Sequence, residues 1–235
     1  MSNARSQAVI FDLDGTLVDS EPNYYEAGRQ LLAQYGVLDF DWEQHSRFIG
    51  ISTRETLETL RAEYGITAPV DELLPRQDRL YLERVRASTE VFPEMRKLVE
   101  RLHAGGVPMA VASGSSRAAI DAALSVTGLD AYMATTVSAD EVPHGKPEPD
   151  VFLAAARRLG TRPADCVVVE DAVPGVLAAH AAGMRCVAIP YLPDTASDPA
   201  YGTAGLLFPG GRRDFTAQAA YAWIFGADGG RPGAV

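Results

Sequence analysis

Short apolar runs alternate with amphipathic segments along most of this chain. Five runs have the length and composition of buried strands, at residues 8–11, 107–112, 132–137, 166–169 and 184–189. Apolar residues at helical spacing fill the later intervals, at residues 94–103, 115–126, 150–159 and 173–182. Nearly continuous apolar strands that alternate with helices are typical of a parallel sheet covered on both faces. The pattern therefore predicts an α/β protein with a doubly wound parallel sheet.

The interval between the first two strands has a different character. No strand pattern occurs between Asp19 and Ala87, where apolar residues recur at helical spacing and one helix is expected at about 75–85. The core is therefore expected to be split by a helical insertion. We predict three parts: a Rossmann-like core of residues 1–19 and 89–225, a helical domain of residues 20–88, and a flexible Gly- and Pro-rich tail of residues 226–235.

Composition narrows the class of protein. The chain has 235 residues, of which 47% are apolar and 22% charged, as in an ordinary globular protein. No apolar stretch approaches the roughly 20 residues of a membrane helix. Arg5 precedes only a short apolar run that ends at Asp12, unlike a secretory signal peptide, and Cys166 and Cys186 make no disulfide framework. We expect a cytoplasmic protein with no membrane partner.

The overall charge is strongly negative. The chain has 31 acidic and 21 basic residues, so its formal net charge is −10. A nucleic-acid partner is therefore not expected, because there is no basic excess to release counterions. A phosphate ligand would need local positive charge or a metal ion.

Polar residues with catalytic potential follow the predicted strands, at the point where each strand ends. In a parallel sheet these ends meet at one edge, where ligands bind. The residues are Asp12 and Asp14 after the first strand, Ser113 and Gly114 after the second, Lys146 after the third, and Glu170 and Asp171 after the fourth.

This set of side chains favours phosphoryl transfer. Clustered carboxylates stay ionised only around a cation, and oxygen ligands suit a hard ion such as Mg²⁺. One aspartate can then act as a nucleophile, while a second one protonates the leaving oxygen and later activates water. Gly114 precedes a predicted helix whose N–H groups suit a phosphate, and Lys146 neutralises charge on the transferred oxygens.

Four segments of the chain resemble, in order, the four motifs of the haloacid dehalogenase-like superfamily: Asp12-Leu-Asp-Gly-Thr16, Ser113, Lys146-Pro-Glu-Pro and Glu170-Asp171. The resemblance extends from Ile10 to about Gly183. It implies that Asp12 is a nucleophile that forms an aspartyl-phosphate and that Asp14 is the general acid/base. It also implies phosphate ligands at Ser113, Gly114 and Lys146. Mg²⁺ would be held by the Asp12 carboxylate, the Asp14 backbone carbonyl and Asp171, with support from Glu170.

The helical insertion resembles the α-helical cap of subfamily I in that superfamily. Its linkers near Ser20 and Ser88 are then expected to be hinges. Residues 50–54 resemble a cap loop that faces the substrate, and we expect Arg54 and Arg47 to clamp an anionic or sugar substrate. Closure of the cap over the substrate would exclude water and set specificity.

Within the superfamily, the pattern is similar to the branch of β-phosphoglucomutases and of sugar-phosphate and phosphoglycolate phosphatases. Dehalogenases lack the aspartate that stands here at Asp14, which disfavours carbon–halogen hydrolysis. Mutases usually carry a histidine in the stretch that matches residues 23–26, where this chain has none, and its absence favours hydrolysis. The expected function is Mg²⁺-dependent hydrolysis of a small phosphomonoester. A sugar phosphomutase and a non-catalytic phosphate-binding protein are the alternatives.

Several points stay open at this level. The expected partner is a small phosphorylated metabolite, and the chain is expected to be a monomer or weak homodimer. His45 in the cap and His144 near Lys146 have no assigned role. We expect the tyrosines of the first cap helix to belong to the core of the cap.

Overall fold

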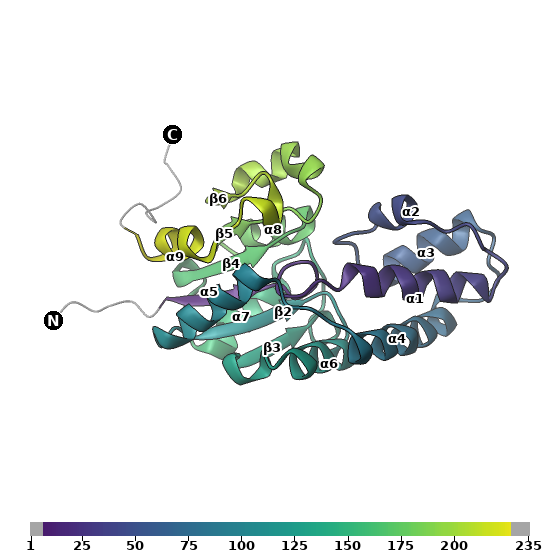
Figure 1. Cartoon of the computed structure of the whole chain (residues 1–235), viewed down its shortest axis with the longest axis horizontal. Coiled ribbons are helices and arrows are strands. Elements are labelled where there is room, and N and C mark those ends of the chain that lie inside the picture. The colour runs from purple at the N-terminus through teal and green to yellow at the C-terminus, as the bar shows by residue number, and fades with distance from the viewer. Residues whose placement is uncertain (1–6, 227–235) are drawn as a thin grey trace.

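The computed structural model describes residues 7–226, and a parallel sheet lies at its centre (Figure 1). The strands stand in the order β3-β2-β1-β4-β5-β6, and each pairs in parallel with its neighbours. The chain thus builds outward from β1 on one side and from β4 on the other, which opens a ligand crevice where their carboxyl ends meet. The strands are β1 Ala8–Phe11, β2 Met109–Ser113, β3 Thr135–Ser138, β4 Cys166–Glu170, β5 Arg185–Ala188 and β6 Leu206–Leu207.

Helices cover both faces of the sheet, as the sequence predicted. Successive strand residues point to opposite faces, so Phe11 and Ile10 belong to two different apolar clusters. The Phe11 cluster includes α5, α6 and α9, and the Ile10 cluster includes α7 and α8. Both cysteines are buried and free, as expected for small core residues. These helices are α5 Pro93–Ala104, α6 Arg117–Thr127, α7 Asp150–Leu159, α8 Val173–Ala181 and α9 Ala217–Phe225.

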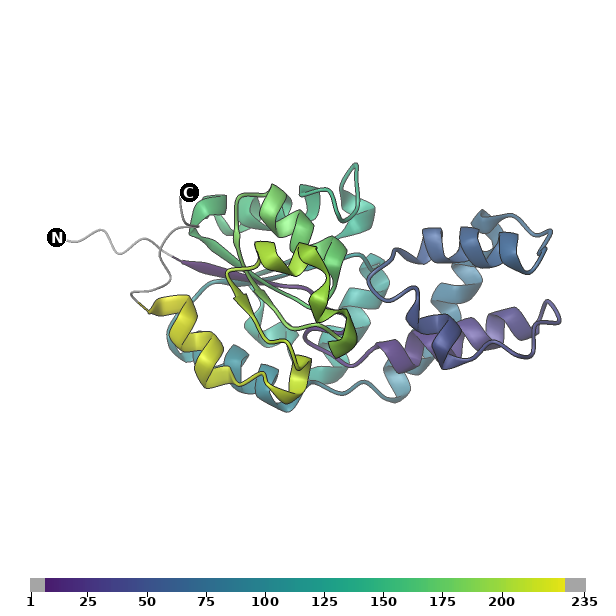
Figure 2. The same ribbon diagram turned by 90° about the horizontal axis from the view of Figure 1, so that it is seen from above.

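The first four helices after β1 gather at one end of the molecule, beside the carboxyl edge of the sheet (Figures 1 and 2). They have an apolar cluster of their own, which includes Leu31, Phe40, Leu57 and Leu73. Helix α4 also packs along α6 of the sheet layer. In the described part of the chain, no helix combines the length and apolar character needed to cross a membrane. These helices, called the cap below, are α1 Glu21–Ala33, α2 Trp42–Ser46, α3 Thr53–Glu63 and α4 Val70–Ala87.

One prediction about the elements was wrong, and two elements were not predicted. The helix expected at about 75–85 begins at Val70, so Pro75 lies inside α4 instead of starting it. The sequence reading followed the preference of proline for the first helical turn, but one proline removes only a single backbone hydrogen bond. No element was expected after residue 189, where β6 and α9 occur. β6 has two residues, and the many alanines of α9 hide its buried face.

The predicted tail, residues 226–235, lies outside the described residues apart from Gly226. The division into a core of residues 1–19 and 89–225 and a cap of residues 20–88 stays a prediction. The two linkers fall at Ser20, which precedes α1, and at Ser88, which follows α4.

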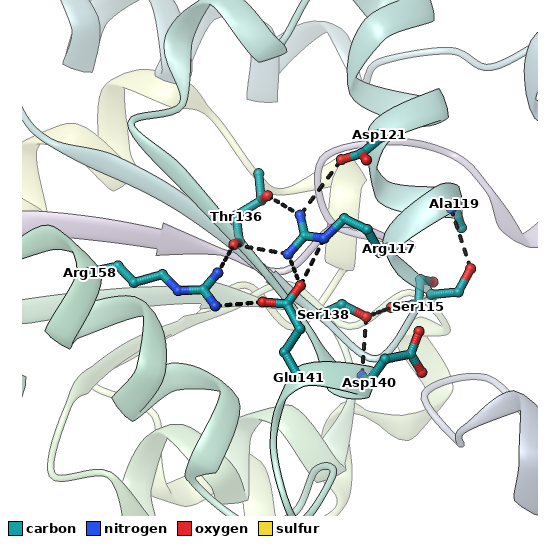
Figure 3. Close-up of polar contacts among 10 residues, drawn as sticks. Ser115, Arg117, Ala119, Asp121, Thr136, Ser138, Asp140, Glu141 and Arg158 are labelled. Carbon is teal, nitrogen blue, oxygen red and sulfur yellow. Dashed lines mark hydrogen bonds and ion pairs between the residues drawn. The ribbon is translucent and has the colours of Figure 1, made fainter.

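The edge strand β3 is covered by two arginines. Arg117 of α6 and Arg158 of α7 both donate to the backbone carbonyl of Thr136, and both bind the carboxylate of Glu141 (Figure 3). Unpaired edge carbonyls are a template for another strand, so this cover protects the edge. Because Glu141 begins the loop that carries Lys146, the same contacts anchor that loop.

Close packing at the end of β4 gives a testable prediction. A Cβ atom on Gly175 of α8 would overlap the carboxylate of Glu170, which is held on several sides. We expect Gly175→Ala to lower the free energy of unfolding by about 2 kcal/mol in urea denaturation.

Gly28→Ala in α1 is the matched control, because its Cβ would lie 3.6 Å from Phe40, an ordinary contact. Alanine at such a site stabilises a helix by about 0.5–1 kcal/mol. Equal stability of the two variants would contradict the close approach at Gly175.

Candidate active site

The core residues predicted for the site meet at the carboxyl edge of the sheet. Asp12 and Asp14 follow β1, Ser113 and Glu170 end β2 and β4, Gly114 and Asp171 follow them, and Lys146 comes from the loop between β3 and α7. A cavity of about 130 Å³ lies between this edge and the cap. All of these residues except Ser113 line it.

Lys146 is the cation of the site. Its Nζ atom lies 2.5 Å from Oδ1 of Asp12 and 2.6 Å from Oε1 of Glu170, and its side chain is 10% exposed. Burial tends to lower the pKa of this lysine, but the charges of Asp12 and Glu170 outweigh burial and raise it above its ordinary value. Lys146 is therefore a fixed positive charge beside the predicted nucleophile.

Backbone and hydroxyl groups orient the two acids that follow β4. Oε2 of Glu170 accepts hydrogen bonds from the N–H groups of Asp171 and Ala172, each at 2.7 Å. Asp171 accepts a hydrogen bond of 2.8 Å from the hydroxyl of Thr16. Gly15 has a φ of 77°, and a Cβ there would lie 2.5 Å from Oδ2 of Asp171. Glycine is thus needed for the turn that brings the two motifs together.

The site carries more negative than positive charge. Burial raises the pKa of Asp12 to about 8, against the opposing charge of Lys146. Burial and the charges of Glu170 and Asp12 raise the pKa of Asp171 well above its ordinary value. Carboxylates in such a place keep protons or bind a cation.

The donor set fits a hard divalent cation. Asp12, Glu170 and Asp171 each offer an oxygen, and these oxygens lie within 4.8 Å of one another. Oxygen donors alone suit Mg²⁺ rather than Zn²⁺. Both oxygens of Glu170 already bind neighbouring groups, which agrees with a supporting place for it. A contribution from the Asp14 carbonyl stays a prediction.

The carboxylate of Asp14 has partners different from those of Asp12. It accepts hydrogen bonds from Tyr81 at 3.0 Å, Ser113 at 3.0 Å and Ser115 at 2.5 Å. The hydroxyl of Tyr24 lies 2.6 Å from that of Ser115. Because Tyr24 and Tyr81 come from α1 and α4, groups of the cap help to hold this core carboxylate.

The loop after β2 supplies backbone and hydroxyl groups. Gly114 and Ser115 line the cavity, whereas Ser113 is fully buried, and its hydroxyl also accepts the N–H of Ser115. The carbonyl of Ser115 accepts a hydrogen bond of 2.6 Å from Ser138 (Figure 3). Ser113 therefore shapes the loop in this arrangement, and its role as a phosphate ligand stays a prediction.

The cap residues divide into two groups. Arg47 and Arg54 do not line the cavity; they form exposed ion pairs with Glu63 and Asp71, each at 2.8 Å. The substrate contacts expected of them therefore stay predictions. Of the two histidines without an assigned role, His45 of the cap is buried and lines the cavity. His144, in the core loop that carries Lys146, is exposed and lies 3.7 Å from Asp150.

A cap loop touches the core beside the acids. Gly50 has a φ of 82°, and a Cβ there would lie 2.5 Å from that of Ala172. Both residues line the cavity. Only a glycine allows this approach of the loop to the end of β4.

Sequence reasoning missed several residues of the site. Tyr24 was expected in the core of the cap, but its hydroxyl reaches Ser115. Tyr81 and Gln77 lie on α4, four residues apart on one helical face, inside the helix already expected at about 75–85. Only the direction in which that face points was missing from the sequence. The signal in the sequence that could have pointed to Glu21 is its position directly after the predicted hinge at Ser20.

The parallel sheet, with buried carboxylates and a lysine at its carboxyl edge, defines an α/β enzyme core. A model of the haloacid dehalogenase-like hydrolases matches residues 9–189. The chain belongs to this family, as its four motifs indicated.

Curated relatives agree with that assignment. The chain is 37% identical over 192 residues to the bifunctional riboflavin kinase/FMN phosphatase of Arabidopsis thaliana, which covers 80% of the chain and 49% of that protein. It thus spans about half the length of this relative. It is 38% identical over 187 residues to the fructose-1-phosphate phosphatase YqaB of Escherichia coli, covering 78% of the chain and 96% of that protein.

A solved structure supports the same fold. The β-phosphoglucomutase of Clostridium difficile superposes with a TM-score of 0.75 at 24% identity, covering 93% of this chain and 95% of that one. The match confirms the predicted α/β fold, in which a parallel sheet is flanked by helices.

The buried lysine gives a second prediction. Lys146→Met would leave Asp12 and Glu170 without their shared cation. Removing one partner of a buried ion pair lowers the free energy of unfolding by about 3–5 kcal/mol. We expect urea denaturation in EDTA to show a loss of unfolding free energy in that range.

Lys97→Met is the control, because Lys97 forms an ion pair with Glu94 on the surface, with 65% of its side chain exposed. Such pairs contribute about 0–1 kcal/mol. A loss at Lys146 no larger than that at Lys97 would contradict the central place of this lysine.

Proposed function

We propose that the chain is a Mg²⁺-dependent phosphatase that hydrolyses small phosphomonoesters through an aspartyl-phosphate on Asp12. The observation that carries this proposal is the contact of Lys146 with both Asp12 and Glu170, next to Asp171, in a buried cavity. Membership of the hydrolase family and the phosphatase relatives support it.

The first step needs a nucleophile that the substrate can reach from the cavity, and the negative charge of the phosphate must be neutralised. A carboxylate oxygen of Asp12 attacks phosphorus, and Lys146 stabilises the charge on the transferred oxygens. Mg²⁺, held by Asp12, Asp171 and the Asp14 carbonyl with Glu170 in support, would neutralise phosphate charge and orient the ester.

Asp14 handles the protons. Its carboxyl group donates a proton to the leaving oxygen and then accepts one from the water that attacks the phosphoenzyme. Tyr81 and Ser115 hold this carboxyl group, so its orientation depends on the position of the cap. Gly114 and Ser115 offer polar groups to the phosphate from the start of α6.

The substrate class follows from the relatives and the cavity. Fructose 1-phosphate and FMN, named for the two relatives, are phosphomonoesters of different sizes. We further expect the protein to act as a monomer or weak homodimer in the cytoplasm. Hinges at Ser20 and Ser88 would let the substrate enter.

The direct test is release of phosphate from a panel of phosphomonoesters, with Mg²⁺ and with EDTA. We expect EDTA to lower the rate at least about 100-fold, and Asp12→Asn at least about 1000-fold. The control is Asp130→Asn, an exposed residue before β3 at the opposite edge of the sheet, which should keep wild-type turnover.

Other products would reject hydrolysis. Isomerised hexose phosphates without free phosphate would indicate a mutase. Phosphate binding without turnover of any ester would indicate a binding protein. Full activity of Asp12→Asn would sink the covalent mechanism.

Tyr81 gives a further prediction, which rests on Asp14 as acid/base. Tyr81→Phe removes one hydrogen bond to that carboxylate, so we expect kcat to fall about tenfold with little change in KM. Tyr35→Phe is the control, since the Tyr35 hydroxyl only accepts a hydrogen bond from Arg76 in the cap. Steady-state kinetics of both variants decide the matter, and an unchanged kcat for Tyr81→Phe would contradict the orienting role.

A further inference from the structure

The cavity has two halves of different chemistry. The core half holds the acids and Lys146. The cap half is walled by apolar side chains, among them Leu32, Phe40, Phe48 and Leu57. A phosphate that contacts Lys146 would project its leaving group into this cap half.

Glu21 and His45 form a buried pair in the cap half. Nε2 of His45 lies 3.0 Å from Oε2 of Glu21, and their side chains are 9% and 8% exposed. The rings of Tyr25 and Trp42 lie 5.7 Å and 5.2 Å from the histidine ring. Because a carboxylate lies in contact with the imidazole, this pair provides no free cation to the cavity.

Gln77 is a further polar feature of the cap half, in addition to the hydroxyl residues Ser52, Thr53 and Thr56. It lines the cavity, is 5% exposed, and its Oε1 atom has no hydrogen-bond partner in the structure. A buried amide oxygen without a partner is unfavourable unless a ligand supplies a donor. It therefore calls for an O–H or N–H group on whatever fills the cavity.

Among the described residues that line the cavity, Lys146 is the only lysine or arginine. Arg47 and Arg54 are engaged on the surface by Glu63 and Asp71. A carboxylate or second phosphate on the leaving group would therefore enter a largely apolar space in which no lysine or arginine pairs with it.

We propose that Gln77, with the Glu21–His45 pair, selects an uncharged, hydroxyl-bearing leaving group and rejects an acidic one. The inference rests on the proposed phosphatase function and narrows its substrate class to phosphates of neutral polyols or sugars. Gln77 accepts a hydroxyl of the leaving group, the apolar walls contact its carbon skeleton, and a carboxylate at the same place stays unpaired. Phosphoglycolate and similar acid phosphates are then poor substrates.

The experiment compares esters that differ only at one carbon. Glycerol 3-phosphate and 3-phosphoglycerate share a skeleton, as do glucitol 6-phosphate and 6-phosphogluconate, and each second member has a carboxylate in place of CH₂OH. We expect kcat/KM to be at least about 30-fold higher for the neutral member of the better-used pair.

Two variants assign the selection to these residues. Gln77→Leu should lower kcat/KM for the neutral ester about tenfold, while its Tm stays equal or rises because an unpaired buried acceptor is removed. Glu21→Gln should lower the ratio of kcat/KM for the neutral ester to kcat/KM for the acidic ester about tenfold. Gln30→Leu is the control and should leave the preference unchanged, because Gln30 of α1 binds Glu26 and does not line the cavity. A loss of Tm with unchanged kcat/KM in Gln77→Leu would make that residue merely structural and overturn its role.

The outcomes separate this inference from the function on which it rests. Phosphate release that is equal or faster from the acidic esters overturns the inference and leaves the phosphatase standing. If the acidic ester is preferred and Arg54→Gln abolishes that preference, the cap arginines and not Gln77 recognise the leaving group, and the inference is overturned. No release from any ester would remove the proposed function, and the inference with it.

Discussion

The active site depends on one ammonium group placed between two buried carboxylates. Lys146 comes from the loop that follows the edge strand β3 and contacts Asp12 and Glu170 at the ends of the central strands β1 and β4. It therefore ties that loop to the predicted nucleophile. One cation cannot neutralise Asp12, Asp14, Glu170 and Asp171, and burial, together with this excess of negative charge, raises the pKa values of Asp12 and Asp171. A chain with a net charge of −10 thus has a place where both a divalent cation and a phosphate are favourable.

The general shape of this site was accessible from the sequence because strand ends are easy to locate. Asp12 and Asp171 lie directly after apolar runs, and a parallel sheet brings such ends to one edge. The same logic placed Glu170, whose place at the last position of β4 follows from the β-branched run before it. Lys146 lies well beyond the end of β3, and the resemblance of its Lys-Pro-Glu-Pro segment to a family motif was needed to place it in the site.

The cap was harder to predict because its contacts depend on helix rotation and not on order along the chain. Arg54 stands in a loop with a recognisable pattern, yet its side chain pairs with Asp71 on the surface. Gln77 has no motif around it, although it lies inside the helix expected at about 75–85, and it lines the cavity. Tyr81, one turn further on, reaches Asp14 from the same helix. The face that α4 turns toward the core depends on tertiary packing, which the helical pattern alone does not give.

The approach of Gly50 to Ala172 has a consequence for how closely the cap can meet the core. The contact lies at the cavity, where a methyl group on Gly50 would hold the cap loop away from the core. The fit between cap and core is therefore set at this point by a residue that is not one of the predicted catalytic groups. A single methyl group there would change the width of the cavity mouth and leave every predicted catalytic side chain in place.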